Sequence, residues 1–207
     1  MMKGKNIFDS IEKIQNNIID NKEEIERLDQ QIGDGDHIFN ILRGLEEISK
    51  LRESLIGEPI DKVFKQLGMK IMTTVGGSSG ALFATLLIGM AKNYNSQSTD
   101  QENIAKMFYE GVEAMKKRGK SGSGEKTMLD VLIPVSEILC ECKNEKNSKI
   151  VADKVKKVAE KSMLSTKDML ATKGRASFLG ERSKGHIDPG ARSSQLAIDA
   201  VCNQFIN

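Results

Sequence analysis

The sequence predicts an all-α protein, built as an antiparallel bundle of about eight helices. Apolar residues recur at helical spacing in one segment after another. Ala, Ile, Leu, Met, Lys and Glu dominate the composition, and only three prolines interrupt 207 residues. No convincing strand, internal repeat or shift in composition is visible, so we expect a single domain over residues 1–207.

Composition narrows the class of protein further. Hydrophobic residues make up 39% of the chain, enough for one core. The net charge of +2, with both signs interspersed, favours neither nucleic acid nor a membrane surface as a partner. Three cysteines without framework spacing argue against disulfides and for a reducing compartment. With no apolar leader and no run approaching about 20 apolar residues, we expect a cytoplasmic protein.

The first half of the chain predicts five helices. Amphipathic stripes and one nearly all-apolar stretch place them at 7–19, 21–31, 36–48, 60–75 and 81–91. Gly57-Glu58-Pro59 breaks the pattern before the fourth helix, where Pro59 suits a helix start. Gly76 to Gly80 separates the fourth helix from the fifth, which we expect to be central and buried.

The second half predicts four more helical segments and two loops. The helices are expected at 100–118, 128–142, 148–170 and 193–205, with a kink at Pro134. A glycine-rich loop covers 119–124, and a polar loop of about 20 residues covers 172–192. A loop of that length in a compact domain is usually functional.

Three carboxylates and an imidazole lie in the nine residues from Asp29 to His37. Two like charges about 4 Å apart repel by about 4 kcal/mol near a protein surface, so such a loop usually holds a cation. Oxygen ligands suit Mg²⁺ or Ca²⁺ better than zinc. The alternative is a solvated acidic turn that caps the next helix. Ile38 and Leu45 occupy ligand positions of an EF-hand register that begins at Asp34, so that motif is excluded.

The three aspartates, Asp29, Asp34 and Asp36, could hold two Mg²⁺ ions, because Mg²⁺ commonly takes one or two protein carboxylates. Such a pair of ions would suit phosphoryl transfer. His37 follows directly after two carboxylates, and the sequence gives no reason to make it a nucleophile.

Three further stretches could bind phosphate, each with a plainer alternative. Gly76 to Gly80 leads into a helix and could offer backbone N–H donors, or it could simply form a tight turn. Gly119 to Thr127 has the glycine spacing of a P-loop, but Glu125 replaces the lysine and a helix precedes it. The loop 174–192 carries three Arg, one Lys and one His, which suit phosphate oxygens, although a solvated basic loop has the same composition.

Together these motifs resemble the L subunit of dihydroxyacetone kinase over essentially the whole chain. The matching blocks are Asp29…Ile32-Gly33-Asp34-x-Asp36-His37…Asn40, Gly77-x-Ser79-Gly80, Arg118-Gly119-Lys120…Lys126-Thr127-Met128-x-Asp130 and Gly174-Arg175-Ala176-Ser177-Phe178-Leu179-Gly180-Glu181-Arg182-Ser183-x-Gly185-His186-x-Asp188-Pro189-Gly190-Ala191. The resemblance implies an eight-helix antiparallel barrel with ADP or ATP bound at one end. It implies that Asp29, Asp34 and Asp36 hold two Mg²⁺ ions, with Asp34 and Arg175 as the catalytic pair.

The resemblance also implies nucleotide contacts and partners. The expected contacts are His37, Ile38, Phe39, Asn40, Ser78, Ser79, Gly119, Met128, Arg175, Asp188, Pro189 and Gly190. A separate K subunit would hold dihydroxyacetone covalently on its own histidine. The family has a branch that depends on the phosphotransferase system and a branch that uses ATP. A stand-alone L chain resembles the first, in which bound ADP is rephosphorylated by a phosphohistidine protein of the phosphotransferase system.

Alternatives remain open at this point. The chain could serve an ATP-dependent ketose kinase with exchanging nucleotide, or act as a non-catalytic, nucleotide-loaded regulator, and a homodimer is possible. Two residues depart from the family pattern. Ile38 replaces a common glycine, and Ala81 replaces a common proline. Both neighbour the expected phosphate site, so they bear on how long nucleotide stays bound.

Overall fold

The computed structural model describes residues 4–206, and every regular element in that range is a helix. The α-helices are α1 (Gly4–Asp20), α2 (Lys22–Ile32), α3 (His37–Ser49), α4 (Arg52–Leu55), α5 (Ile60–Thr74), α6 (Gly77–Lys92), α7 (Asp100–Gly119), α8 (Leu129–Glu141), α9 (Ser148–Ser165) and α10 (Pro189–Ile206). Two 3₁₀ helices, η1 (Thr166–Asp168) and η2 (Arg175–Ser183), lie between α9 and α10. The all-α prediction is confirmed.

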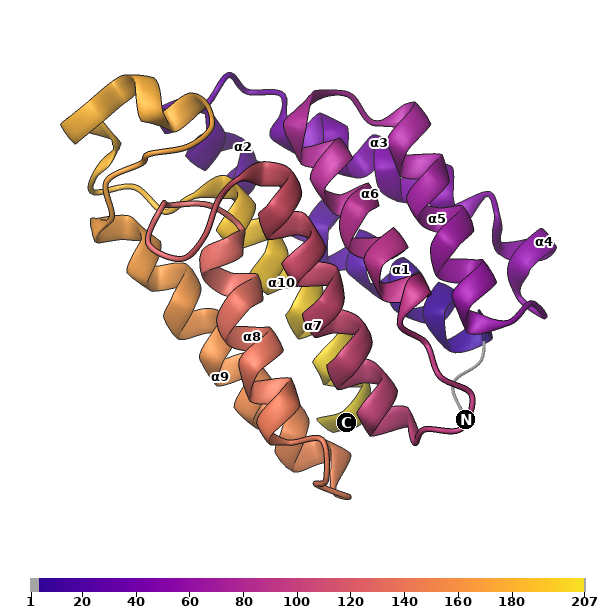
Figure 1. The fold of residues 1–207 in the computed structure, drawn as a ribbon. Helices are drawn as coiled ribbons and strands as arrows, with labels where there is room; N and C mark the ends of the chain where they lie inside the picture. Colours follow the sequence, from indigo (N-terminus) through magenta and orange to yellow (C-terminus); the bar gives the residue numbers. More distant parts are fainter. Residues whose placement is uncertain (1–3, 207) are drawn as a thin grey trace.

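Eight of the helices close into a ring (Figure 1). From α5 to α10 each helix packs against the next, and α10 then packs against α1, α1 against α3, and α3 against α5. The short α4 contacts α1, while α2 lies against α10, α3 and η2. The ring is the eight-helix barrel that the family resemblance implied.

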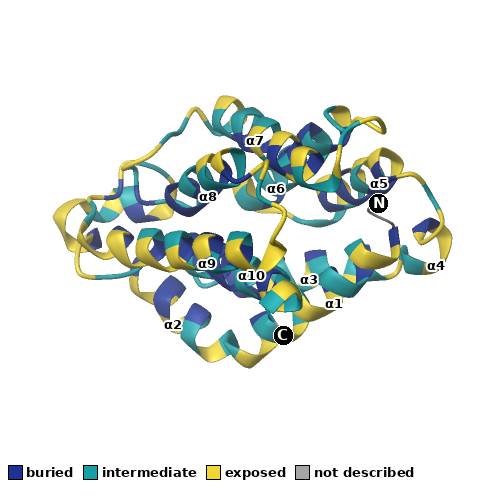
Figure 2. Cartoon of the chain, turned by 90° about the horizontal axis from the view of Figure 1, so that it is seen from below, coloured by how far each residue is buried: buried dark blue, intermediate teal, exposed yellow. Residues whose placement is uncertain are grey.

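The helices pack through their apolar stripes. Phe8 of α1 and Val63 and Leu67 of α5 belong to one buried apolar cluster. Val131 and Ala159 are buried where α8 packs against α9. Burying each large apolar side chain contributes about 1.5–3 kcal/mol. Figure 2 shows that the helices carry buried positions on one side and exposed positions on the other. The ring therefore depends on sequence-encoded amphipathic stripes.

Close approach between α6 and α7 depends on two glycines. A Cβ atom built on Gly89 would lie 2.9 Å from the Cα atom of Gly111. Since real Cβ atoms do not approach other atoms so closely, a side chain at either position would push these two helices apart. The pair lets α6 pack closely against α7. Most of residues 81–91 are nevertheless only partly buried, so α6 is one helix of the ring wall and not the central, buried helix that was expected.

Because successive helices run in opposite directions, starts and ends of different helices meet at one end of the ring (Figure 1). The starts of α3, α6, α8 and α10 meet there with the ends of α2, α5, α7 and α9. Unpaired N–H groups and the positive end of the macrodipole make each helix start attractive to anions. All the motifs singled out in the sequence fall at this end.

Some predicted boundaries were wrong. Helix α6 begins at Gly77, not Ala81, so Ser78 and Ser79 form its first turn. Helix α10 begins at Pro189, not at residue 193, because proline is favoured in the first turn of a helix. Within residues 4–206, no helix has the length and apolarity needed to cross a membrane.

Candidate functional site

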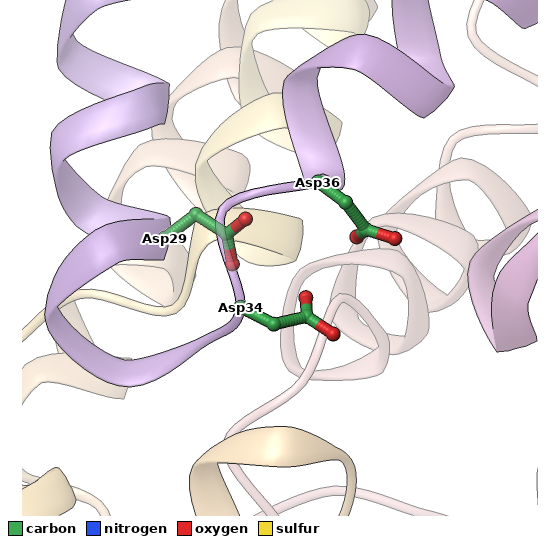
Figure 3. Close-up of side chains that lie close together, drawn as sticks. All are labelled: Asp29, Asp34 and Asp36. Carbon is green, nitrogen blue, oxygen red and sulfur yellow. The ribbon is translucent and has the colours of Figure 1, made fainter.

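The carboxylates of Asp29, Asp34 and Asp36 lie together between the end of α2 and the start of α3 (Figure 3). One ligand oxygen from each residue lies within 4.8 Å of the other two. Asp29 comes from the last turn of α2 and is buried, while Asp34 and Asp36 come from the loop and are exposed. The cluster is thus anchored on one side and open on the other.

Backbone groups hold the buried carboxylate in place. The His37 N–H donates to Oδ2 of Asp29 at 3.0 Å. A Cβ atom on Gly33 would lie only 1.9 Å from Oδ1 of Asp29, so only glycine leaves room for the carboxylate. Gly35 has a φ of +79°, in the region that favours glycine, and turns the chain toward α3. The two glycines of this loop therefore have separate structural tasks.

The donor set fits a hard divalent cation. It consists of carboxylate oxygens alone, which is the chemistry that Mg²⁺ selects. Three like charges held in one loop also need a compensating positive charge. Among residues 4–206, Asp29, Asp34 and Asp36 are therefore the acidic group that could hold a divalent cation such as Mg²⁺.

A positive side chain reaches the cluster from a distant part of the sequence. Nε of Arg175, at the start of η2, lies 2.8 Å from Oδ2 of Asp34. Gly174, with a φ of +64°, precedes it and turns the chain into η2. The long polar loop predicted between the last two helices thus folds over the acidic cluster and places a guanidinium there.

His37 connects the acidic loop to α10. Its ring is buried, and Nε2 lies 3.0 Å from Oγ of Ser193. Burial lowers the pKa of His37 below 6.5, although the nearby Asp29 carboxylate opposes the shift. The ring therefore bridges the acidic loop and the start of α10.

The start of α10 forms a second, buried part of the site. Oδ2 of Asp188 accepts a hydrogen bond of 2.7 Å from the N–H of Ala191, which caps the helix. Burial raises the pKa of Asp188 to about 7, against hydrogen bonding from Ala191 and the charge of Lys126. A Cβ atom on Gly190 would lie 3.4 Å from the Cβ of Met128, so the α7–α8 loop and α10 meet here.

The other predicted contacts are distributed around the same end. The Ile38 side chain is fully buried against Ile18, Ile25 and Leu196, so only its backbone can face a ligand. Phe39 is half exposed, with Nζ of Lys22 5.6 Å from its ring centroid.

Asn40 is buried one turn into α3, and Pro189 is buried at the start of α10. Ser78 and Ser79 form the first turn of α6, and Gly119 ends α7 beside Leu82. Direct contacts join Arg175 to Asp34 and His37 to Asp29.

Sequence reasoning assigned no role to three buried polar residues behind the α7–α8 loop. Asp130 accepts hydrogen bonds from the N–H groups of Gly124 and Thr127, the latter at 2.7 Å. Lys126 and Thr166 are almost completely buried and join this loop to the end of α9. Lys126 gave no local signal, because a lysine in a glycine-rich loop looks like an exposed residue.

Known proteins with similar sequences point to one family. The family model described as DAK2 domain matches residues 31–203. A Listeria innocua protein named PEP-dependent dihydroxyacetone kinase 1, ADP-binding subunit DhaL, is 44% identical over 88% of this chain and 87% of its own length. The Escherichia coli ADP-binding subunit DhaL of PEP-dependent dihydroxyacetone kinase is 41% identical over 80% of both chains. The corresponding Lactococcus lactis protein, named PTS-dependent, is 40% identical over 91% of both.

A solved structure supports the fold. The dihydroxyacetone kinase of C. freundii, in complex with AMP-PNP and Mg²⁺, superposes with a TM-score of 0.73 at 23% identity. The match covers 95% of this chain but 33% of that longer protein. The resemblance found in the sequence motifs is thereby confirmed, and the chain belongs to the DAK2 domain family, among relatives of the L subunit of dihydroxyacetone kinase.

Proposed function

We propose that this chain is the nucleotide-binding subunit of a dihydroxyacetone kinase, and that it presents a phosphoryl group to dihydroxyacetone held on a partner K subunit. The observation that carries the proposal is the acidic cluster with its guanidinium: three carboxylates within 4.8 Å of one another, and Arg175 2.8 Å from Asp34. That arrangement can position phosphate oxygens and offset their charge.

Each part of the site has a role in this proposal. Asp29, Asp34 and Asp36 hold Mg²⁺, and three carboxylates support a count of two ions. Bound Mg²⁺ would neutralise charge on the nucleotide phosphates. Arg175 supplies a planar, permanently charged group beside the same position. N–H groups at the start of α6, around Ser78 and Ser79, would donate hydrogen bonds to phosphate oxygens.

The second part of the site would bind the rest of the nucleotide. Met128, Gly190 and the capped turn at Asp188 form a surface where the α7–α8 loop meets α10. Glycine at position 190 keeps this surface open to close approach. The nucleotide would then extend from the acidic cluster to this surface, across the end of the ring.

Relatives support the branch of the family in which ADP stays bound. The three relatives named as ADP-binding subunits are 40–44% identical and similar in length to this chain. We therefore propose that a phosphohistidine protein of the phosphotransferase system rephosphorylates the bound ADP. Ile38 does not alter the site surface, since its side chain lies in the core.

The competing branch is a kinase that exchanges ATP for ADP. Relatives named triokinase/FMN cyclase and L-erythrulose 1-kinase are 27–31% identical, and the chain spans about a third of their length. Native mass spectrometry of the purified chain separates the branches. Co-purified ADP with two Mg²⁺ ions would support the first branch, and a site that is empty in every preparation would argue against it.

The enzymatic role is tested by Asp34→Asn in the complex reconstituted with the K subunit and the phosphohistidine protein. We expect phosphoryl transfer to fall by at least about 10²–10³-fold, because the variant loses a charge at the metal cluster. Circular dichroism and the thermal midpoint should stay unchanged. Asp61→Asn, an exposed aspartate in the first turn of α5, is the matched control. Full activity in Asp34→Asn would exclude the role assigned to the cluster.

A further inference from the structure

Lys126 is an unusual residue for a glycine-rich loop. Its side chain is 1% exposed, among the most buried large side chains of residues 4–206. Its backbone has a φ of +60°, a conformation that side-chain-bearing residues rarely adopt. Burying an ammonium group is costly unless its hydrogen bonds are satisfied. A residue that is both buried and conformationally strained must therefore be held by specific contacts.

Three backbone carbonyls satisfy the Lys126 ammonium group. Nζ donates to the carbonyl oxygens of Thr166 at 2.6 Å, of His186, and of Lys167 at 3.5 Å. Thr166 and Lys167 lie in η1, directly after α9, and their carbonyls also accept hydrogen bonds from the N–H groups of Met169 and Gly185. The lysine uses all three of its donors and joins segments 40 to 60 residues apart in sequence.

The joined segments are those that carry the second half of the candidate site. Met128 follows Lys126 by two residues, and Asp188 follows His186 by two. The N–H of Asp188 also donates to Oγ1 of Thr166 at 3.1 Å, so Thr166 contacts both sides of the junction. The Met128–Gly190 surface is thus built on a frame whose centre is the ammonium group of Lys126.

We infer that Lys126 is a positioning residue for nucleotide binding: it sets the distance between the α7–α8 loop and the start of α10 without touching the ligand. The inference rests on the proposed function for the ligand's identity. An apolar side chain would remove the buried donor to all three carbonyls, although those of Thr166 and Lys167 also accept from backbone N–H groups. Arginine would bring a wider planar group into a space fitted to an ammonium. The acidic cluster lies on α2 and the α2–α3 loop, outside this frame.

The test compares two ligands that use different halves of the site. ADP binding in the presence of Mg²⁺ is measured by calorimetry, and binding of Mn²⁺ alone by electron paramagnetic resonance. In Lys126→Met we expect the dissociation constant for ADP to rise by at least about tenfold, because small displacements of a binding surface are costly. Mn²⁺ affinity should be unchanged. Lys117→Met, at an exposed lysine on α7, is the control and should match the wild type for both ligands.

Two results would overturn the inference: unchanged ADP affinity in folded Lys126→Met, or an equal loss of ADP and Mn²⁺ affinity, which would indicate general damage. If Lys126→Met does not fold, Thr166→Val decides, because it removes the hydroxyl that accepts from Asp188 while leaving the carbonyl. Thr166→Val should weaken ADP binding alone, and an unchanged value would exclude the frame. Failure of the wild type to bind ADP would instead contradict the proposed function.

Discussion

The two halves of the candidate site are built in opposite ways. The acidic half comes from nine consecutive residues, Asp29 to His37, and two of its three carboxylates are exposed. The other half is buried and assembled from the α7–α8 loop, the end of α9 and the start of α10. The first half concentrates charge that a ligand must offset. In the second half the buried side chains of Lys126, Asp130 and Asp188 have hydrogen-bond partners within the protein, and together they support a shaped surface.

Because of this difference, the two halves suit different tasks in ligand binding. An open carboxylate cluster can gain and lose cations, but it has little shape with which to select a nucleotide. A buried frame can select by shape, yet it offers few charges to phosphates. Two side chains of the long loop reach the acidic half: Arg175 contacts Asp34, and Nδ1 of His186 lies 3.1 Å from Oε1 of Gln31. The comparison predicts that changes in the two halves will have separable effects on metal binding, nucleotide binding and transfer.

The largest expected effect is on transfer, from Arg175→Ala. Loss of the guanidinium should lower the rate of phosphoryl transfer by about 10²–10³-fold, as for other groups that stabilise developing charge. Thermal stability should hardly change, because an ion pair with one partner 71% exposed contributes little.

The measurement is the transfer rate in the reconstituted complex. Arg182→Ala, an exposed arginine of the same η2 segment, is the control and should keep the wild-type rate. Equal losses in both variants would show that the loop acts only through its overall charge.

A smaller effect is expected on stability, from Asp188→Asn. The folded pKa of Asp188 is raised to about 7 from 3.8, so the folded state binds more protons than the unfolded state between these values. The contribution of Asp188 to stability is therefore present below about pH 4 and is lost as the pH rises through 7. The asparagine variant lacks this dependence but keeps an acceptor for Ala191.

The free energy of unfolding is measured by chemical denaturation at about pH 4.5 and about pH 7.5, where Asp188 is expected to be protonated and ionised, respectively, in the folded protein. The wild type should lose about 3 kcal/mol relative to Asp188→Asn across this range. The depressed pKa of His37 favours folding as pH rises, but it is common to both proteins and cancels in the difference. A difference independent of pH would mean that Asp188 is ionised throughout.

The smallest effect is expected on metal affinity, from Gly33→Ala. The new methyl group would lie 1.9 Å from Oδ1 of Asp29 and must displace the carboxylate. We expect Mn²⁺ affinity to fall by about tenfold, as for loss of support around a metal ligand.

Gly57→Ala, where nothing lies within 4 Å of the added Cβ, is the control for this change. Gly33 is not part of the frame around Lys126, which meets α2 where Nδ1 of His186 lies 3.1 Å from Oε1 of Gln31. We expect the frame to keep its protection against hydrogen exchange in Gly33→Ala. Lost protection at Ala191 in Gly33→Ala would show that the two halves are not independent.

The sequence predicted the acidic half well because its residues are neighbours in the chain. Spacing alone placed three carboxylates together, and the glycines between them suggested a turn. The eight-helix architecture followed from apolar stripes and from the family resemblance, and the structure confirms it. Helix α4 went unpredicted because four residues carry too little periodic signal.

The buried half could not be predicted in the same way. Lys126 contacts residues 40 to 60 positions away, and no local pattern distinguishes it from the exposed Lys120. The early start of α6 was missed because glycines and serines look like a loop, although they can form a first turn. Contacts over such separations appear only when the ring is closed.

The most direct test of the account is the affinity for ADP with Mg²⁺ and with EDTA, measured by calorimetry on the wild-type chain. If metal ions held by Asp29, Asp34 and Asp36 join the phosphates to the acidic half, ADP should bind about 100-fold more tightly with Mg²⁺. Asp34→Asn should lose most of that difference, while Lys126→Met should keep it at a lower overall affinity. Equal ADP affinity in Mg²⁺ and EDTA would contradict a site whose two halves are joined through metal.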